Sequence, residues 1–148
     1  MKTAKQGLAE CFPAACAALS GRPLADIMRE AAHAAGVTDW CGMHNEWFER
    51  VWRNYTVCRL AFAYLRQKYT PWLSVRFLYN TYGSARDARE LPPGRGVVTF
   101  YKRGSRHILA YADGMLFVSD VNYPDIMTLT EYLAASEFAV EKIIPEVK

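Results

Sequence analysis

Cys11 stands where the sequence predicts that a helix begins. It directly precedes an alanine-rich stretch, residues 12–19, in which Pro13 suits the first turn of a helix and Gly21 its end. A helix N-terminus carries partial positive charge and favours the thiolate, which is the attacking form of cysteine. Cys11 is therefore a candidate nucleophile, and the alternative is a small apolar residue packed in the core.

A hairpin late in the chain predicts the base that such a thiol needs. Asp113-Gly114 is a favoured dipeptide for a two-residue type I′ turn between two apolar runs. Counting back along both strands, from Ala112 opposite Met115, pairs His107 with Asp120. Directly opposed residues point to the same side of a sheet, with Cβ atoms about 4.5–5.5 Å apart. The sequence thus predicts an imidazole beside a carboxylate.

Together, Cys11, His107 and Asp120 favour nucleophilic catalysis. A histidine held by a carboxylate has a fixed tautomer, and its other nitrogen is free to act as a base. The backbone N–H groups in the first turn of a helix can also bind an oxyanion. Two alternatives stay open: the His107–Asp120 pair can be structural, and Asn122 can replace Asp120 if the register slips.

The elements that must position these residues follow from apolar spacing and turn residues. Helical spacing predicts helices over residues 12–19, 23–35, 44–55 and 57–69. Short β-branched and aromatic runs predict strands over residues 97–101, 107–112, 115–119 and 138–144, with a short helix over 128–135. The segment 71–82 fits a helix or a strand, and residues 83–96 are predicted to form a polar loop.

The composition indicates one globular domain. The chain has 148 residues, of which 51% are hydrophobic and 22% are charged, and this length can bury a sizeable core. We expect a single α+β domain over residues 1–148, with a helical part over about 1–70 and a sheet part over about 97–148. The net charge of +3 is too small to indicate nucleic acid as a partner.

The N-terminal residues and the cysteines bear on the compartment. The apolar run after Lys2 and Lys5 is interrupted by Gln6, Glu10 and Pro13, which argues against a signal peptide. No segment reaches the roughly 18 apolar residues that a membrane span needs, so no membrane partner is expected. The four cysteines show no CxxC spacing, which favours reduced thiols in the cytoplasm over a disulfide framework.

The order of these features resembles a minimal papain-like cysteine peptidase. The resemblance is carried by Cys11-Phe-Pro-Ala-Ala, Arg106-His-Ile-Leu-Ala, Asp113-Gly and Ser119-Asp. The layout is most similar to bacteriocin-processing peptidases and to short papain-like proteins of phages and bacteria. It implies N-terminal helices, the first opened by the cysteine, followed by a small antiparallel sheet that carries the histidine and an Asp or Asn.

The resemblance also implies a role for Gln6. In papain-like enzymes a glutamine shortly before the cysteine completes the oxyanion hole, and Gln6 occupies the matching place. The chain departs from the family in two respects: no glycine follows Cys11, and Gln6 precedes Cys11 by five positions, one fewer than is usual. The implied catalytic set is Cys11, His107, Asp120 and Gln6, with no metal and no cofactor.

Two further clusters offer weaker chemistry. Cys41, His44 and Cys58 supply three candidate zinc ligands, but a fourth is missing and the spacing fits no usual site. A basic cluster is expected beside His107, either as a solvated loop or as a flank of the site that favours an acidic substrate. Its members are Lys102, Arg103 and Arg106, with Arg95 and Tyr101 nearby.

Two functions of different classes fit the sequence. The first is a cysteine hydrolase, of peptidase or amidase type, that acts on a protein or peptide substrate through a Cys-His-Asp triad. The alternative is a papain-like binding or inhibitory module that occupies a protein partner without turnover. Selective alkylation of one thiol at mildly acidic pH would favour the enzyme, and sluggish reactivity of all four cysteines the module.

Overall fold

Helices occupy the first half of the chain. The computed structural model describes residues 1–40, 42–74 and 88–147. Its helices up to residue 69 are α1 (Cys11–Ser20), α2 (Leu24–Ala34), α3 (His44–Glu46), the π-helix η1 (Trp47–Trp52) and α4 (Tyr55–Tyr69). The predicted helices are confirmed, except that the stretch predicted as one α-helix over 44–55 is a single α-turn that continues as η1.

The second half forms an antiparallel sheet with one helix. The strands are β1 (Arg95–Lys102), β2 (Ser105–Ala112), β3 (Met115–Phe117), β4 (Ile126–Met127) and β5 (Ala139–Pro145), in the order β4-β3-β2-β1-β5. Helix α5 (Leu129–Ser136) lies between β4 and β5 in the chain, and Thr128 caps it by accepting a hydrogen bond from the Glu131 N–H. The predicted α+β class is therefore confirmed. The two-residue strand β4 was not predicted, and most of the ambiguous segment 71–82 lies outside the described residues.

The turn between β2 and β3 is the type I′ turn that the sequence predicts. Both central residues have positive φ, 52° at Asp113 and 82° at Gly114, which the Asp-Gly dipeptide tolerates. Ala112 lies opposite Met115, and the predicted register holds for the next two pairs as well. The ladder then stops, because β3 ends at Phe117 and the next amide donates instead to the Asp125 carbonyl, 2.8 Å away. The prediction of a strand to residue 119 is wrong at that end.

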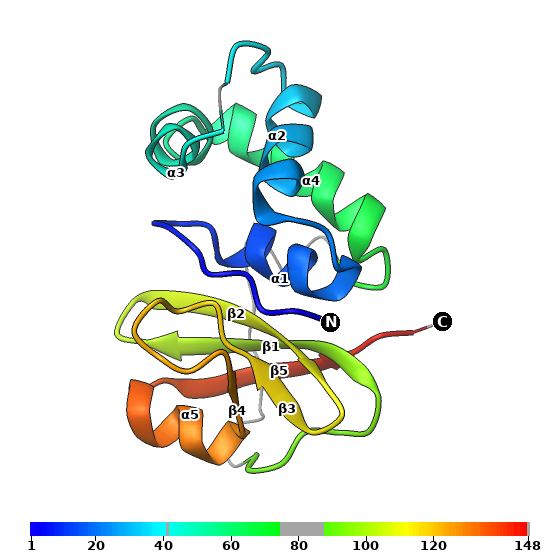
Figure 1. The fold of residues 1–148 in the computed structure, drawn as a ribbon, viewed down its shortest axis with the longest axis vertical. Coiled ribbons are helices and arrows are strands. Elements are labelled where there is room, and N and C mark those ends of the chain that lie inside the picture. Colours follow the sequence, from blue (N-terminus) through cyan, green and yellow to red (C-terminus); the bar gives the residue numbers. More distant parts are fainter. Residues whose placement is uncertain (41, 75–87, 148) are drawn as a thin grey trace.

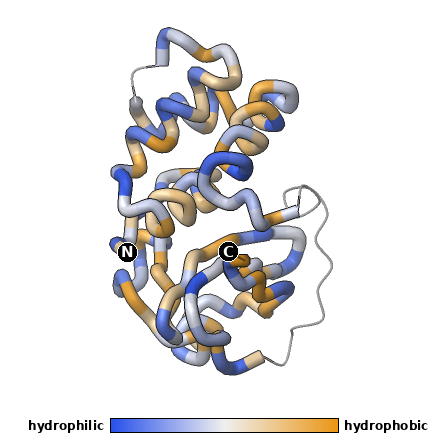
Figure 2. Tube along the Cα trace, turned by 90° about the vertical axis from the view of Figure 1, so that its right-hand side faces the viewer, coloured by the Kyte–Doolittle hydropathy of each residue, from blue (hydrophilic) through white to orange (hydrophobic). Residues whose placement is uncertain are grey.

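The sheet separates two hydrophobic clusters. Helix α1 packs on β2, with the other N-terminal helices beyond it, and α5 covers the opposite face of the sheet (Figure 1). Ile108 and Ala110 belong to the cluster on the α1 side, whereas Leu109 and Tyr111 belong to the cluster on the α5 side. This alternation is the period of two expected for a strand buried on both faces. Figure 2 shows hydrophobic and hydrophilic residues following one another along the chain.

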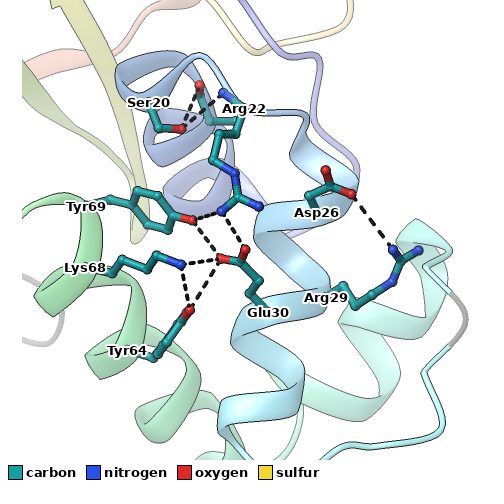
Figure 3. Close-up of polar contacts among 9 residues, drawn as sticks. Ser20, Arg22, Asp26, Arg29, Glu30, Tyr64, Lys68 and Tyr69 are labelled. Atoms are coloured by element: carbon teal, nitrogen blue, oxygen red, sulfur yellow. Dashed lines mark hydrogen bonds and ion pairs between the residues drawn. The ribbon is translucent and has the colours of Figure 1, made fainter.

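A polar network joins α2 to α4. The Glu30 carboxylate accepts hydrogen bonds from the Tyr69 hydroxyl at 2.7 Å and from the Lys68 ammonium at 3.2 Å, and it forms an ion pair with Arg22 at 2.5 Å (Figure 3). Burial alone would raise the pKa of Glu30, but these donors outweigh it and lower the pKa to about 2. The network fixes the two helices that lie behind α1.

No helix among the described residues is both long and apolar enough to cross a membrane.

Candidate active site

Cys11 is the first residue of α1. The preceding turn brings it there through Ala9, whose φ of 61° lies in the left-handed region, and through Glu10, which precedes the helix with an irregular backbone. The remainder of α1 is almost entirely buried, but Cys11 is only half-buried. The predicted position of the thiol at an accessible helix N-terminus is therefore found.

His107 and Asp120 are in direct contact. The His107 Nε2 atom lies 2.7 Å from Asp120 Oδ1, and the His107 side chain is only 9% exposed. The structure thus brings together the pair that the hairpin register predicts, although the two residues are beyond the end of the β2–β3 ladder. Asn122 is exposed and Asp120 holds the histidine, which decides between the two candidates left open by the sequence.

The imidazole also reaches Cys11. Interaction with the thiol is one of the causes that raise the pKa of His107, and because Asp120 lies at Nε2, the nitrogen left for the sulfur is Nδ1. Burial disfavours the imidazolium, but the hydrogen bonds to Asp120 and Cys11 outweigh it and raise the pKa of His107 from 6.5 to about 9. The arrangement therefore stabilises a protonated imidazole next to the sulfur.

Asp120 has a second partner that the sequence did not indicate. The Tyr132 hydroxyl, from α5, donates to Asp120 Oδ2 at 3.0 Å, so each carboxylate oxygen has its own donor. Burial would raise the pKa of Asp120, but its bonds to His107 and Tyr132 hold it below its usual value. The carboxylate is thus kept ionised and fixed in orientation.

Aromatic rings of the α5-side cluster pack against the imidazole. The Phe138 ring is stacked on His107, with centroids 5.6 Å apart and planes 20° apart, and the Tyr132 ring lies nearly parallel to Phe138. The Lys102 ammonium lies over the Phe138 ring, 5.3 Å from its centroid. This stack restricts rotation of His107 and keeps water from its buried side.

Gln6 lies beside the segment that carries Asp120. Its backbone N–H donates to the Ser119 carbonyl at 3.0 Å, and its side-chain Oε1 accepts from the Ser119 hydroxyl at 2.5 Å. With Oε1 occupied in this way, the Nε2 group is left as the donor of the amide. Ala9, with φ of 61°, lies in the turn that leads from Gln6 to Cys11.

A second histidine–carboxylate pair supports the same turn. Glu10 is fully buried, and its Oε1 accepts from the Gly7 N–H at 2.8 Å and lies 2.5 Å from His44 Nδ1. A Cβ on Gly7 would come within 2.8 Å of the His44 Cβ, so this close approach requires glycine. Trp47 adds a hydrogen bond from its indole N–H to the Ala9 carbonyl at 3.2 Å. The sequence analysis did not assign these roles to Glu10, His44 and Trp47.

The other cysteines include two of the three candidate zinc ligands predicted from the sequence. Cys16 is fully buried, and burial raises the pKa of the half-buried Cys58 to about 11, so both lie in protecting environments. Cys41 lies outside the described residues, and His44 Nδ1 is paired with Glu10. In the part of the chain that the structure describes, no three His, Cys, Asp or Glu side chains are placed to hold a metal ion.

The basic cluster is only partly as predicted. Lys102 donates to the Ser136 carbonyl at 3.2 Å, and Arg106 faces Glu141 at 3.8 Å, so both side chains are engaged near His107. Arg95 lies at the other end of β1, where it binds the Leu19 carbonyl and the Glu146 carboxylate. Its predicted place in the cluster is therefore wrong, because the eight-residue strand β1 separates it from Lys102.

Comparisons with known proteins found no match: no family model, curated protein or solved structure matches the chain.

Proposed function

We propose that this protein is a cysteine hydrolase of papain-like type that cleaves a peptide, isopeptide or side-chain amide bond. The observation that carries the proposal is the chain of contacts from Cys11 through His107 to Asp120, built on a helix N-terminus and a strand edge. The raised pKa of His107 supports it, because an imidazolium beside a sulfur favours the thiolate.

The papain-like interpretation is supported by the arrangement of elements as well as by the three side chains. The cysteine opens the first helix, that helix packs on the strand that carries the histidine, and the carboxylate follows the next strand of an antiparallel sheet. Gln6 lies next to the same carboxylate segment. Of these relations, the resemblance implied the helix opened by the cysteine and the histidine and carboxylate on a following sheet.

The geometry supports a two-step acyl transfer. The Cys11 sulfur attacks the carbonyl carbon, and the oxyanion that forms accepts hydrogen bonds from N–H groups in the first turn of α1 and from the Gln6 amide. His107 gives its proton to the leaving amine as the carbon–nitrogen bond breaks, and a thioester remains. A water molecule then loses a proton to His107 and attacks the thioester, which releases the acid and restores the Cys11 thiolate beside a protonated His107. Asp120 stays ionised and keeps His107 oriented throughout.

The proposed substrate is a protein or peptide, and the reaction needs no cofactor, since all groups in these steps belong to the chain or to water. We propose a reducing compartment such as the cytoplasm, because a cysteine nucleophile must stay reduced to work. Cys11 is a free thiol in the structure, as are Cys16 and Cys58.

The test is the rate of Cys11 alkylation by iodoacetamide as a function of pH, read by peptide mass spectrometry. We expect rapid labelling of Cys11 below pH 7 in the wild type and a fall of about tenfold or more in His107→Ala, because the imidazolium no longer stabilises the thiolate. Cys58 provides an internal reference in the same sample, since burial raises its pKa to about 11.

Labelling that rises only near the ordinary thiol pKa of about 8.5 in both proteins would contradict the proposal. The chain would then fit a non-catalytic binding module better. A selective, His107-dependent thiol justifies a screen of peptide and amide substrates, in which Cys11→Ser is the inactive control.

A further inference from the structure

Lys5 lies in a cradle of backbone oxygens. Its ammonium group donates hydrogen bonds to the carbonyls of Val118 at 3.0 Å, Asp120 at 3.0 Å and Tyr123 at 2.9 Å. The Asp125 carboxylate lies 3.1 Å away, but its side chain is 69% exposed and contributes less. An ammonium group has three N–H donors, and here each one has a carbonyl acceptor.

The cradle needs a cation at its centre. Three carbonyl dipoles that point their negative ends at one place repel each other unless a positive charge lies between them. Hydrogen bonds in which the donor is charged are about twice as strong as those between neutral groups. Lys5 therefore holds the segment 118–125 in a shape that it would not keep by itself.

The segment held in this way carries the site. Lys5 binds the carbonyls of Val118 and Asp120, and between them the Ser119 carbonyl accepts from the Gln6 N–H. Three successive carbonyls, ending at the residue that orients His107, are thus fixed by two neighbouring residues of the N-terminal arm. This arm, residues 1–6, runs along the segment 118–125, since Thr3 also donates to the Asp125 carbonyl at 2.7 Å.

We propose that Lys5 is a positioning residue that sets Asp120 and Gln6 together. Its ammonium group fixes the backbone of Asp120, and the same arm places the Gln6 amide against Ser119. Lys5 thereby positions two groups relative to each other. One is the Asp120 carboxylate, which orients His107, and the other is the Gln6 amide, the proposed donor to the oxyanion. The inference rests on the proposed function for its catalytic consequence, whereas the cradle itself is a structural claim that can be tested separately.

The first test compares Lys5→Met with Lys2→Met. Methionine keeps most of the apolar stem of lysine but removes the charge and the three donors. We expect Cys11 in Lys5→Met to be labelled by iodoacetamide at pH 6 about tenfold more slowly than in the wild type, since hydrogen bonds to a charged group are lost. Lys2 is an exposed lysine on the same arm, so Lys2→Met should label at the wild-type rate.

Chemical rescue separates a missing cation from a general loss of packing. The Lys5 side chain is 33% exposed, so a small cation can enter the space that Lys5→Ala leaves. We expect ethylammonium to restore fast labelling of Cys11 in a saturable manner. Tetramethylammonium carries the same charge without an N–H group and should not do so. Equal rescue by both cations, or fast labelling of Lys5→Met without any cation, would overturn the proposal.

Hydrogen exchange makes the outcome independent of a reactive thiol. The amides of Gln6, Val118 and Tyr123 donate within or across this segment, and we expect each to exchange at least tenfold faster in Lys5→Met than in Lys2→Met. If the wild type lacks fast labelling of Cys11, the proposed function fails while the exchange rates still decide the role of Lys5. Unchanged exchange would show that Lys5 does not hold the segment.

Discussion

Two hydrogen bonds to one carboxylate define the site at the scale of single residues. Asp120 accepts a hydrogen bond from His107 at Oδ1 and one from Tyr132 at Oδ2. Tyr132 is fully buried and packs against the ring of Phe100. Burial and the charge of Asp120 both raise the pKa of Tyr132, so the phenol stays a donor across the working range of pH. A carboxylate held at both oxygens cannot rotate, and the imidazole it orients is held with it.

Tyr132→Phe tests this second hydrogen bond. Phenylalanine keeps the ring that is stacked near His107 and Phe138 but removes the donor to Asp120. We expect Cys11 alkylation at pH 6 to slow by about tenfold, and the free energy of unfolding to fall by about 1–2 kcal/mol, because the Asp120 carboxylate loses one of its two donors.

Tyr123→Phe is the matched control for Tyr132→Phe. The Tyr123 ring packs edge-on against Tyr132 at 5.9 Å, but its hydroxyl donates to the Ala135 carbonyl and not to Asp120. Alkylation of Cys11 should therefore keep its wild-type rate in this variant. If both variants slow labelling equally, the ring packing, and not the hydrogen bond to Asp120, determines the alkylation rate of Cys11.

At the scale of elements, the position of α1 depends on the layers on both of its sides. The sheet supports one side of α1, and the helix pair α2–α4 supports the other. The pair α2–α4 is joined by the network around Glu30 (Figure 3), whose side chain is 26% exposed. A displacement of α2 or α4 would therefore shift α1, and the Cys11 thiol would move with it.

Glu30→Gln should loosen α2 from α4. We expect a fall of about 1–2 kcal/mol in the free energy of unfolding at pH 7, measured by urea denaturation, because the charged acceptor of four donors, Arg22, Tyr64, Lys68 and Tyr69, is lost. The pKa of Glu30 is lowered, so its contribution is present above pH 4.5 and is lost as the pH falls toward about 2. The difference in the free energy of unfolding between Glu30→Gln and the wild type should therefore shrink as the pH falls from 4.5 toward about 2.

Asp26→Asn gives the comparison on the same helix. Its ion pair with Arg29 spans 3.8 Å, and both side chains are nearly half exposed, so the change should alter stability by less than about 0.5 kcal/mol. An equal loss in both variants would mean that the charge of α2, and not the network at Glu30, stabilises the pair.

At the scale of the whole molecule, the site joins three parts of the chain that are far apart in the sequence. The thiol comes from the helical layer, the imidazole and carboxylate from the sheet, and Tyr132 from α5 on the opposite face. The stability of the fold should therefore depend on the protonation state of the site.

Cys11→Ser makes this dependence measurable, because it removes the thiol that interacts with His107. The pKa of His107 is raised in the folded protein. The contribution of His107 to stability is therefore complete below pH 6.5 and is lost as the pH rises through the pKa that His107 has in the folded state. That value lies below about 9 in the variant, since the contact with Cys11 contributes to the raised pKa.

Urea denaturation of Cys11→Ser should therefore show a decline in stability above pH 6.5, with a slope of at most about 1.4 kcal/mol per pH unit. The double variant Cys11→Ser/His107→Gln is the control, and its stability should be nearly flat over the same range. A decline of the same size in the double variant would assign the effect to other groups.

The sequence by itself determined the features that depend on short separations. The Asp113-Gly114 turn predicted the register of the β2–β3 ladder, because backbone sterics and pleating set it locally. The same count predicted the His107–Asp120 contact, which the structure contains although both residues lie beyond the end of that ladder. In the same way, Pro13 and Gly21 marked the helix that Cys11 begins.

Only the tertiary structure decided what surrounds these residues. Tyr132 reaches Asp120 because α5 packs on the far face of the sheet, and Glu10 meets His44 because α3 lies on the turn before α1. Lys5 binds carbonyls 113 to 118 positions away in the chain. Such contacts depend on packing between elements and not on local periodicity, so no pattern in a short window of sequence predicts them.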